Sequence, residues 1–167
     1  DVQEKIFAAM YEQEKTKQNI CRLIEGSKVL NIPIVWTEQY PKGLGRTLSE
    51  VSTTLNGAEL LEKITFSCLG DDVVSNRIKS YQKNQVLVCG VETHVCIYQT
   101  VQDLLINNYD VHVVIDAVMS RDKKNHNLGL KKMGALGANI TSVEMALFEL
   151  QQVASGDTFK AIANIVK

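Results

Sequence analysis

The chain has little that would mark a membrane protein or a nucleic-acid-binding protein. Its longest unbroken apolar runs have about five residues, whereas a helix needs ~20 apolar residues to cross a bilayer. Its 18 Lys and Arg residues nearly balance 19 Asp and Glu residues, for a net charge of -1, so it offers no electrostatic footprint for a phosphate backbone. These absences predict a protein without membrane spans and argue against nucleic acid as a partner.

The cysteines and histidines are few and show no metal-binding spacing. Neither C-x-x-C, H-x-H nor H-E-x-x-H occurs among them, and these are the spacings of common metal sites. We therefore expect no metal and no cofactor, and the cysteine pattern favours a reducing compartment. The cysteines are Cys21, Cys68, Cys89 and Cys96, and the histidines are His94, His112 and His126.

The chain also lacks repeats, low-complexity segments and Pro-rich linkers, with only two prolines in 167 residues. A chain of this length can bury a core without the help of disulfides or metals. We therefore predict one domain that covers residues 1–167.

Segments with helical periodicity alternate with segments that look like buried strands. Apolar residues recur at helical spacing in residues 11–30, 72–78, 97–105, 122–136, 144–152 and 158–166. Apolar runs without a polar face occur at residues 32–38, 86–90 and 111–115, and a brief strand is predicted at 138–141. The stretch 39–57, rich in turn-forming residues, predicts a long loop. Because such strands need cover on both faces, the pattern predicts an α/β three-layer sandwich with an open, mostly parallel sheet.

The segment VLVCGVETHVC is the most informative one for function. Its buried strand ends at Gly90, and after a tight turn the chain delivers Cys96 to the start of a helix. Ligands of open α/β sheets bind at this end of the strands. Free N–H groups and the positive end of the helix dipole favour a thiolate, which predicts a lowered pKa and a nucleophilic role for Cys96. The alternative is a small buried residue that only packs.

The sequence does not pair this cysteine with a histidine. His94 lies two residues away on the turn and points to a different side, while His112 begins a strand and His126 lies in a charged segment. A nucleophile needs a base and a group that holds the base. Among the remaining titratable residues at strand ends, Asp1 and Lys63 are the candidates.

Several motifs occur in an order that is informative as a whole. They are DVQ, NIPIVWTEQYPKGLGRT, EKITFSC, VLVCGVETHVCIYQTVQDLL, YDVHVVIDAVMSR and ITSVEMALFEL. In this order, along the whole chain, they resemble the isochorismatase-like (cysteine hydrolase) family, and most of all its isochorismatase domain-containing subgroup. The resemblance implies a Rossmann-like hydrolase fold with a parallel sheet of about six strands. In that family a strand precedes the catalytic aspartate, so we expect further residues upstream of Asp1.

The resemblance also implies a catalytic set. Asp1 is the expected base, Lys63 the cation that holds its carboxylate, and Cys96 the nucleophile. A cis peptide is expected between Val91 and Glu92, with an oxyanion hole formed by the backbone N–H groups of Glu92 and Cys96. Such a set attacks a carbonyl carbon, forms a thioester when the substrate is an amide, and releases the acid with water that Asp1 activates.

The segment TEQY departs from part of the family. Relatives that hydrolyse nicotinamide carry a D-x-H unit there, with a further histidine, to hold a metal, so TEQY predicts no metal and argues against nicotinamidase activity. The cysteine favours amide or acyl substrates over the vinyl ether of isochorismate. Trp36, Gln39, Tyr40 and Phe66 offer flat apolar surface with polar tips and are the candidate substrate-binding residues. The alternative for Trp36 and Phe66 is a position in the hydrophobic core.

Three functions remain open at this point. The first is a metal-independent cysteine hydrolase of a small amide, ester or related molecule. The second is a catalytically silent, oligomeric interaction protein of the same fold, and the third is a ribonuclease, a label that some relatives carry. The resemblance implies a homo-oligomer. The expected compartment is the cytoplasm, or the mitochondrion if a transit peptide lies upstream of Asp1.

Overall fold

A computed structural model describes residues 1–167 as an α/β domain. Its strands are β1 (Trp36–Gln39), β2 (Leu60–Lys63), β3 (Gln85–Val91), β4 (Asp110–Met119) and β5 (Asn139–Thr141). Its α-helices are α1 (Glu4–Phe7), α2 (Gln13–Val29), α3 (Pro41–Leu44), α4 (Ser49–Thr54), α5 (Asp72–Ser80), α6 (Tyr98–Ile106), α7 (Lys123–Ala135), α8 (Val143–Gln151) and α9 (Gly156–Ile165). A 3-10 helix, η1 (Cys68–Gly70), and a π-helix, η2 (Thr93–Ile97), complete the elements.

All strand pairs are parallel, but the strands form two sheets. One sheet has the order β1-β2 and the other β3-β4-β5. The predicted α/β class and parallel pairing are therefore confirmed, with five strands in two sheets instead of about six in one. Strand β1 pairs only with β2, and β3 pairs only with β4, so no hydrogen-bonded strand pair joins the two sheets.

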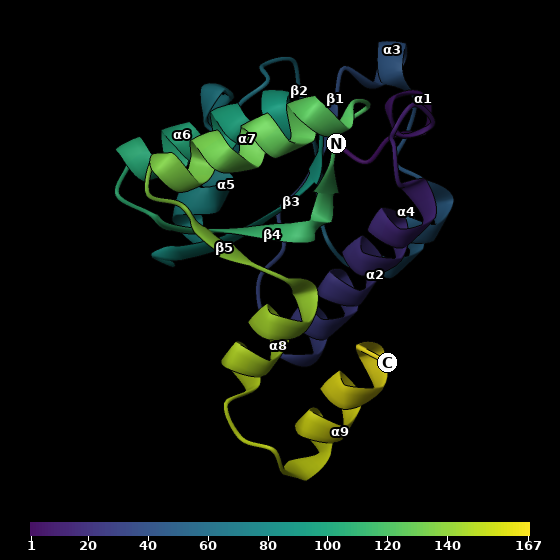
Figure 1. Ribbon diagram of the computed structural model, residues 1–167, viewed down its shortest axis with the longest axis vertical. Coiled ribbons are helices and arrows are strands. Elements are labelled where there is room, and N and C mark those ends of the chain that lie inside the picture. The colour runs from purple at the N-terminus through teal and green to yellow at the C-terminus, as the bar shows by residue number, and fades with distance from the viewer.

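Helices cover both faces of the β3-β4-β5 sheet, which gives the three layers that the sequence predicted. Figure 1 shows α5, α6 and α7 on one face and α2 and α8 on the other, with α9 packed against α2 and α8. Strand β4 serves both cores: Val111 and Val113 pack with α6 and α7, whereas Val114 and Ala117 pack with α2 and α8. Its apolar residues on both faces explain why the sequence of β4 shows no polar face.

No helix of the structure is both long enough and apolar enough to cross a bilayer.

The stretch 39–57, predicted to be a long loop, contains two short helices. Helix α3 begins with Pro41, which suits the first helical position because its missing N–H needs no partner there. Helix α4 buries Val51, which is 1% exposed, in the core beside α2. The turn-forming residues thus mark the ends of these helices, and tertiary packing stabilises the segments between them.

The parallel arrangement brings the carboxyl ends of the strands of each sheet together. Gln39 is in register with Lys63 at the ends of β1 and β2, and Val91 is in register with Met119 at the ends of β3 and β4. Asp1 lies between the two sheets: it contacts Thr37 of β1, and its backbone lies beside Gly90 of β3. The predicted functional residues therefore lie at the carboxyl ends of the strands.

Candidate active site

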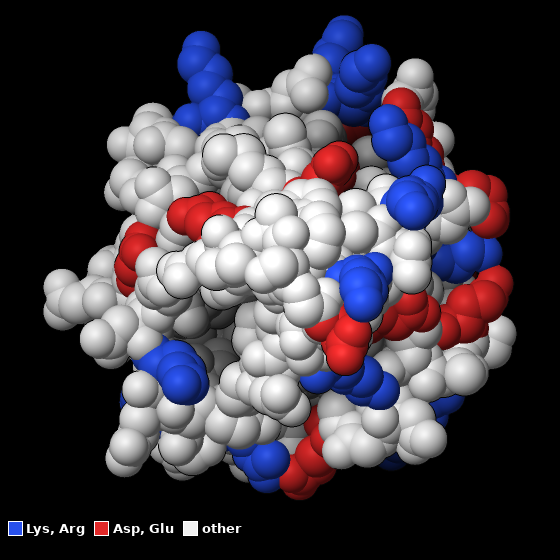
Figure 2. Space-filling model, turned by 90° about the horizontal axis from the view of Figure 1, so that it is seen from below, with Lys and Arg blue, Asp and Glu red and all other residues white.

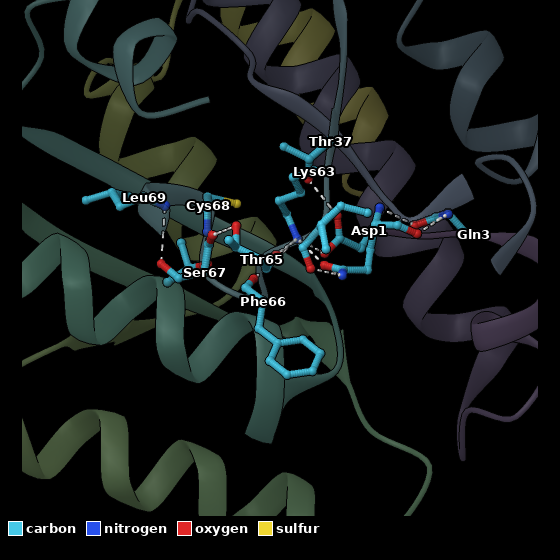
Figure 3. Close-up of polar contacts among 12 residues, drawn as sticks. Asp1, Gln3, Thr37, Lys63, Thr65, Phe66, Ser67, Cys68 and Leu69 are labelled. Carbon is cyan, nitrogen blue, oxygen red and sulfur yellow. Dashed lines mark hydrogen bonds and ion pairs between the residues drawn. The ribbon is translucent and has the colours of Figure 1, made fainter. Parts of the chain in front are cut away.

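Asp1 and Lys63 form a buried ion pair at the end of β2. Lys63 Nζ lies 2.6 Å from Asp1 Oδ2, and the two side chains are 0% and 4% exposed. The Thr37 hydroxyl donates to the other carboxylate oxygen, Asp1 Oδ1, over 2.8 Å. Taking two charges out of water is costly unless further hydrogen bonds satisfy them, and Figure 3 shows these bonds converging on the pair.

The Lys63 ammonium is surrounded by oxygen acceptors. Besides Asp1, it donates to Gln39 Oε1 over 2.8 Å and to the carbonyl oxygens of Thr65 and Phe66 over 3.2 Å each. Burial lowers the pKa of Lys63, while the contact with the Asp1 carboxylate acts in the opposite sense because it stabilises the ammonium form. An ammonium group has three N–H donors, so the protein itself occupies them all.

Cys96 lies beyond the end of β3, within η2, and is 6% exposed. Burial is the largest influence on its thiol and raises the pKa, whereas the Lys63 cation and a backbone hydrogen bond from Glu92 lower it by less. The prediction of a lowered pKa was therefore wrong. The helix start and the nearby cation favour a thiolate as expected, but they act on a sulfur that is shielded from water, and desolvation favours the neutral thiol.

The charges of Lys63 and Cys96 influence each other. Lys63 lowers the pKa of Cys96, and a charge on Cys96 in turn raises the pKa of Lys63. Since the thiol is protonated at neutral pH, it needs a base before it attacks. Asp1 is the carboxylate that this cluster offers.

The turn between β3 and η2 carries the peptide bond expected to be cis. The bond between Val91 and Glu92 is cis in the structure. The Glu92 side chain is buried, and its Oε2 accepts hydrogen bonds from the backbone N–H and from Nε of Arg121, over 3.0 and 3.1 Å. The end of β4 thus holds this turn in place. The oxyanion hole of Glu92 and Cys96 remains a prediction.

The histidines belong to the frame around this turn. His126 Nδ1 lies 3.0 Å from Thr93 Oγ1, and His94 Nδ1 lies 3.0 Å from Ser120 Oγ. These contacts connect η2 to α7 and to the residue after β4. Neither histidine contacts Asp1 or Lys63, and the pairing of Cys96 with Asp1 remains a prediction.

The four candidate substrate-binding residues fall into two groups. Trp36 packs against the core and donates from its indole N–H to Thr47 Oγ1 over 2.9 Å, and Gln39 is 8% exposed with both amide atoms engaged. Tyr40 and Phe66, by contrast, are 51% and 52% exposed beside Lys63. Figure 3 shows the Phe66 ring directed away from the ion pair. Tyr40 and Phe66 are therefore the two that remain free to meet a ligand.

Three contributors to the cluster were not assigned a role from the sequence. Thr37 holds the Asp1 carboxylate, and Gln3 holds the backbone of Gln39. Cys68 of η1 is half-buried, and its backbone N–H donates to Thr100 Oγ1 over 3.0 Å. The only sequence signal for these residues is their position just after a strand or beside an identified motif, which many inert residues share.

Comparison with known proteins identifies the family. The model of the isochorismatase domain matches residues 1–145. The chain is 39% identical to the secreted isochorismatase effector Isc1 of Phytophthora sojae over 100% of the chain and 81% of that protein. It is 36% identical to isochorismatase domain-containing protein 2 of Danio rerio over 99% of the chain and 83% of that protein.

Solved structures agree with this assignment. The MAR1 ribonuclease of Caenorhabditis elegans matches with a TM-score of 0.93 and 32% identity, over 99% of the chain and 85% of that structure. The YcaC gene product of Escherichia coli, described as an octameric hydrolase of unknown specificity, shares the fold with a TM-score of 0.92 and 21% identity, over 98% of the chain and 82% of that structure. The chain therefore belongs to the isochorismatase family and has the isochorismatase-like hydrolase fold.

Proposed function

We propose that the protein is a cysteine hydrolase in which Cys96 attacks the carbonyl carbon of a small amide, ester or related substrate. Asp1 is the base and Lys63 the fixed cation beside it. The observation that carries this proposal is the buried, 2.6 Å ion pair of Asp1 and Lys63 within electrostatic reach of the Cys96 thiol. A structural role alone gives no reason to bury an ion pair beside a thiol, because apolar residues of similar size stabilise a core at least as well.

The reaction then runs through a thioester. Asp1 accepts the thiol proton as the Cys96 sulfur bonds to the carbonyl carbon, and the oxyanion faces the N–H groups of Glu92 and Cys96. The C–N bond of an amide breaks as Asp1 returns the proton to the leaving nitrogen. Asp1 next takes a proton from water, the hydroxide attacks the thioester, and the thiolate leaves and is reprotonated.

The residues at the end of β1 do not fit a metal centre of the Asp-x-His type. Gln39 uses its amide on Lys63 and Ile64, and Tyr40 is largely exposed. An amide oxygen already bonded to an ammonium group is a poor ligand for a cation. We therefore propose chemistry that needs no metal, and we expect turnover to persist in the presence of a chelator.

Alkylation of the cysteines followed by mass spectrometry tests the nucleophile. Iodoacetamide should label Cys96 ahead of Cys21, Cys68 and Cys89, and incubation with a panel of amides and esters should leave an acyl adduct on Cys96. The Cys96→Ala variant should lose turnover completely, with Cys21→Ala, in α2, as the matched control that keeps it. Unselective labelling together with an active Cys96→Ala variant would contradict the proposal.

A ribonuclease is the second candidate, because solved relatives at 31% and 32% identity carry that name. The net charge of -1 gives this reading little support, and Figure 2 shows positive and negative side chains interspersed on the face in view. Degradation of RNA in the presence of a chelator, lost with Cys96→Ala, would favour it over amide hydrolysis. Absence of any turnover, with an unreactive Cys96, would identify a silent interaction protein.

We further propose that the chain assembles into a homo-oligomer. The E. coli structure of the same fold is described as octameric, and this chain exposes large apolar side chains that water does not favour, among them Ile106, Met145 and Val153 at 70%, 60% and 60%. Sedimentation velocity should give a mass that is a multiple of 18.6 kDa. A monomer at micromolar concentration would contradict this proposal without affecting the chemistry.

A further inference from the structure

Gln39 makes more contacts with the catalytic cluster than a substrate-binding residue needs. Its Oε1 accepts from Lys63 Nζ over 2.8 Å, and its Nε2 donates to the carbonyl oxygen of Ile64. Only the Asp1 carboxylate lies closer to the Lys63 ammonium. The amide is therefore oriented unambiguously, with its oxygen toward the cation and its nitrogen toward a carbonyl.

The backbone of Gln39 is fixed as firmly as its side chain. Its N–H donates to Gln3 Oε1 over 2.7 Å, and its carbonyl accepts from Gln3 Nε2 over 3.0 Å. The same Nε2 donates to the carbonyl of Gly45 over 2.7 Å, and Gln3 is 0% exposed. The Gln3 side chain thus bonds both backbone groups of Gln39. Gln3 lies two residues after Asp1, so the base and the residue that holds its cation share one rigid support.

We propose that Gln39 is a positioning residue whose neutral amide holds the Lys63 ammonium against the Asp1 carboxylate without adding a negative charge beside Cys96. This inference rests on the proposed cysteine chemistry. It changes the role of Gln39 from a substrate-binding residue to a residue that positions the Lys63 cation. Lys63, with its donors occupied, then acts through its charge alone.

The neutrality of the amide matters because of the charges around the sulfur. Asp1 and Lys63 together carry no net charge. The thiolate that forms at Cys96 is therefore influenced by one positive and one negative charge that cancel. Asp71, at the start of α5, is a further negative charge that acts on Lys63. The remaining charged groups at this turn, Glu92 and Arg121, are paired with each other.

A carboxylate in place of the amide changes that balance. In Gln39→Glu the side chain keeps its length and its acceptor for Lys63, but the cluster gains a negative charge. The thiolate then forms less readily, so the pH midpoint of Cys96 alkylation should rise by about one unit, which is a tenfold lower rate at a fixed pH below the midpoint. The limiting rate of Cys96 alkylation at high pH should change little, because the Lys63 cation remains in place.

The matched control is Gln13→Glu. Gln13 donates to the carbonyl oxygens of Ala8 and Met10 near the start of α2, so this change adds the same charge away from the cluster. The pH midpoint of Cys96 alkylation in Gln13→Glu should equal that of the unaltered protein. If Gln39→Glu and Gln13→Glu both keep the original midpoint while Cys96 remains reactive, the inference is wrong and the proposed function survives.

A second measurement does not depend on the reactivity of Cys96. With isotope-labelled lysine, the buried Lys63 ammonium should give a slowly exchanging N–H signal at neutral pH, because oxygen acceptors hold all its donors. Gln39→Met keeps the size of the side chain but removes the strong acceptor, so it should broaden or abolish that signal. A signal that is unchanged in a folded Gln39→Met protein would overturn the inference, even if Cys96 proves inert and the proposed function fails.

Discussion

At the scale of single residues, the site depends on burial as much as on identity. Desolvation raises the pKa of the Cys96 thiol and lowers that of Lys63, so both groups are pushed toward their neutral forms. Contact with Asp1 keeps Lys63 charged, and the charge of Lys63 in turn brings the thiol closer to ionisation. The three groups therefore work as a unit, and a change at one should alter the others.

The Asp1→Asn variant separates the two effects of the carboxylate. It removes the base, so turnover should fall by at least about 100-fold. It also removes the negative charge that neutralises Lys63, so the pKa of Cys96 should fall and iodoacetamide should react faster with Cys96 at pH 7. The rates of turnover and of Cys96 alkylation, measured on the same preparation, should therefore change in opposite directions.

Asp1→Glu, which keeps the charge, is the companion variant. It should retain a Cys96 midpoint close to that of the unaltered protein while its longer side chain disturbs the 2.6 Å contact with Lys63. Slower alkylation in Asp1→Asn than in the unaltered protein would mean that loss of the base outweighs the lower pKa of the thiol. Turnover of Asp1→Asn at the rate of the unaltered protein would contradict the assignment of Asp1 as the base.

At the scale of elements, helix α7 packs directly on the turn that carries the nucleophile. A Cβ atom at Gly129 would lie 3.1 Å from the Thr93 carbonyl oxygen and 3.2 Å from the backbone of His94. These neighbours are main-chain atoms, which cannot move aside as a side-chain tip does. Glycine at this position therefore lets α7 approach η2 closely.

Gly129→Ala should push α7 away from η2 and reduce turnover by about tenfold or more, since displacements of about 1 Å at a reacting group have effects of this size. Its free energy of unfolding should fall by about 1 to 3 kcal/mol. Initial rates and urea unfolding at equal protein concentration measure both quantities.

Gly134→Ala in the same helix is the matched control. No atom lies within 4 Å of its added Cβ, so it should raise the free energy of unfolding by up to about 1 kcal/mol through helix propensity and leave turnover unchanged. Equal effects of the two substitutions on turnover would show that the approach of α7 to η2 has no part in holding Cys96.

The elements themselves follow the sequence patterns to different degrees. The helix predicted over residues 11–30 is α2, Gln13–Val29, and the apolar run 86–90 lies within β3, Gln85–Val91, because each has a continuous pattern of one period. The stretch 39–57 was not predicted as helical, since its short helices are stabilised by contacts with distant residues. The local sequence does not indicate such contacts.

At the scale of the whole molecule, a buried thiol links stability to alkaline pH. Burial raises the pKa of Cys89 from 9.0 to about 11. A group whose pKa is raised by folding contributes stability that is complete below its unfolded pKa and is lost as the pH rises through its folded pKa. The loss attributable to Cys89 therefore falls between pH 9 and pH 11, and amounts to at most about 2.7 kcal/mol.

The Cys89→Ala variant should accordingly show a smaller decrease of its free energy of unfolding between pH 9 and pH 11 than the unaltered protein. Other groups titrate in this range, so the difference between the two pH curves is the quantity to measure, by urea unfolding at each pH. Parallel curves would mean that Cys89 keeps an ordinary pKa in the folded protein.

The sequence by itself determined the α/β class, the parallel pairing of the strands and the family. Periodicity and turn residues are local properties, and the motifs keep their order along the chain whatever the packing. The sequence also singled out Asp1, Lys63 and Cys96 through their motifs. It gave no means to tell whether Gln39 faces a ligand or another residue.

Only the tertiary structure decided how these residues act on one another. It brought Asp1 and Lys63 into contact, turned the Gln39 amide toward the cation, and reversed the expected direction of the Cys96 pKa. The physical reason is that a contact across 62 positions of the chain and the removal of a sulfur from water both arise when all the layers pack together. A pattern of neighbouring residues sets the period of an element, but the distances between elements depend on the whole fold.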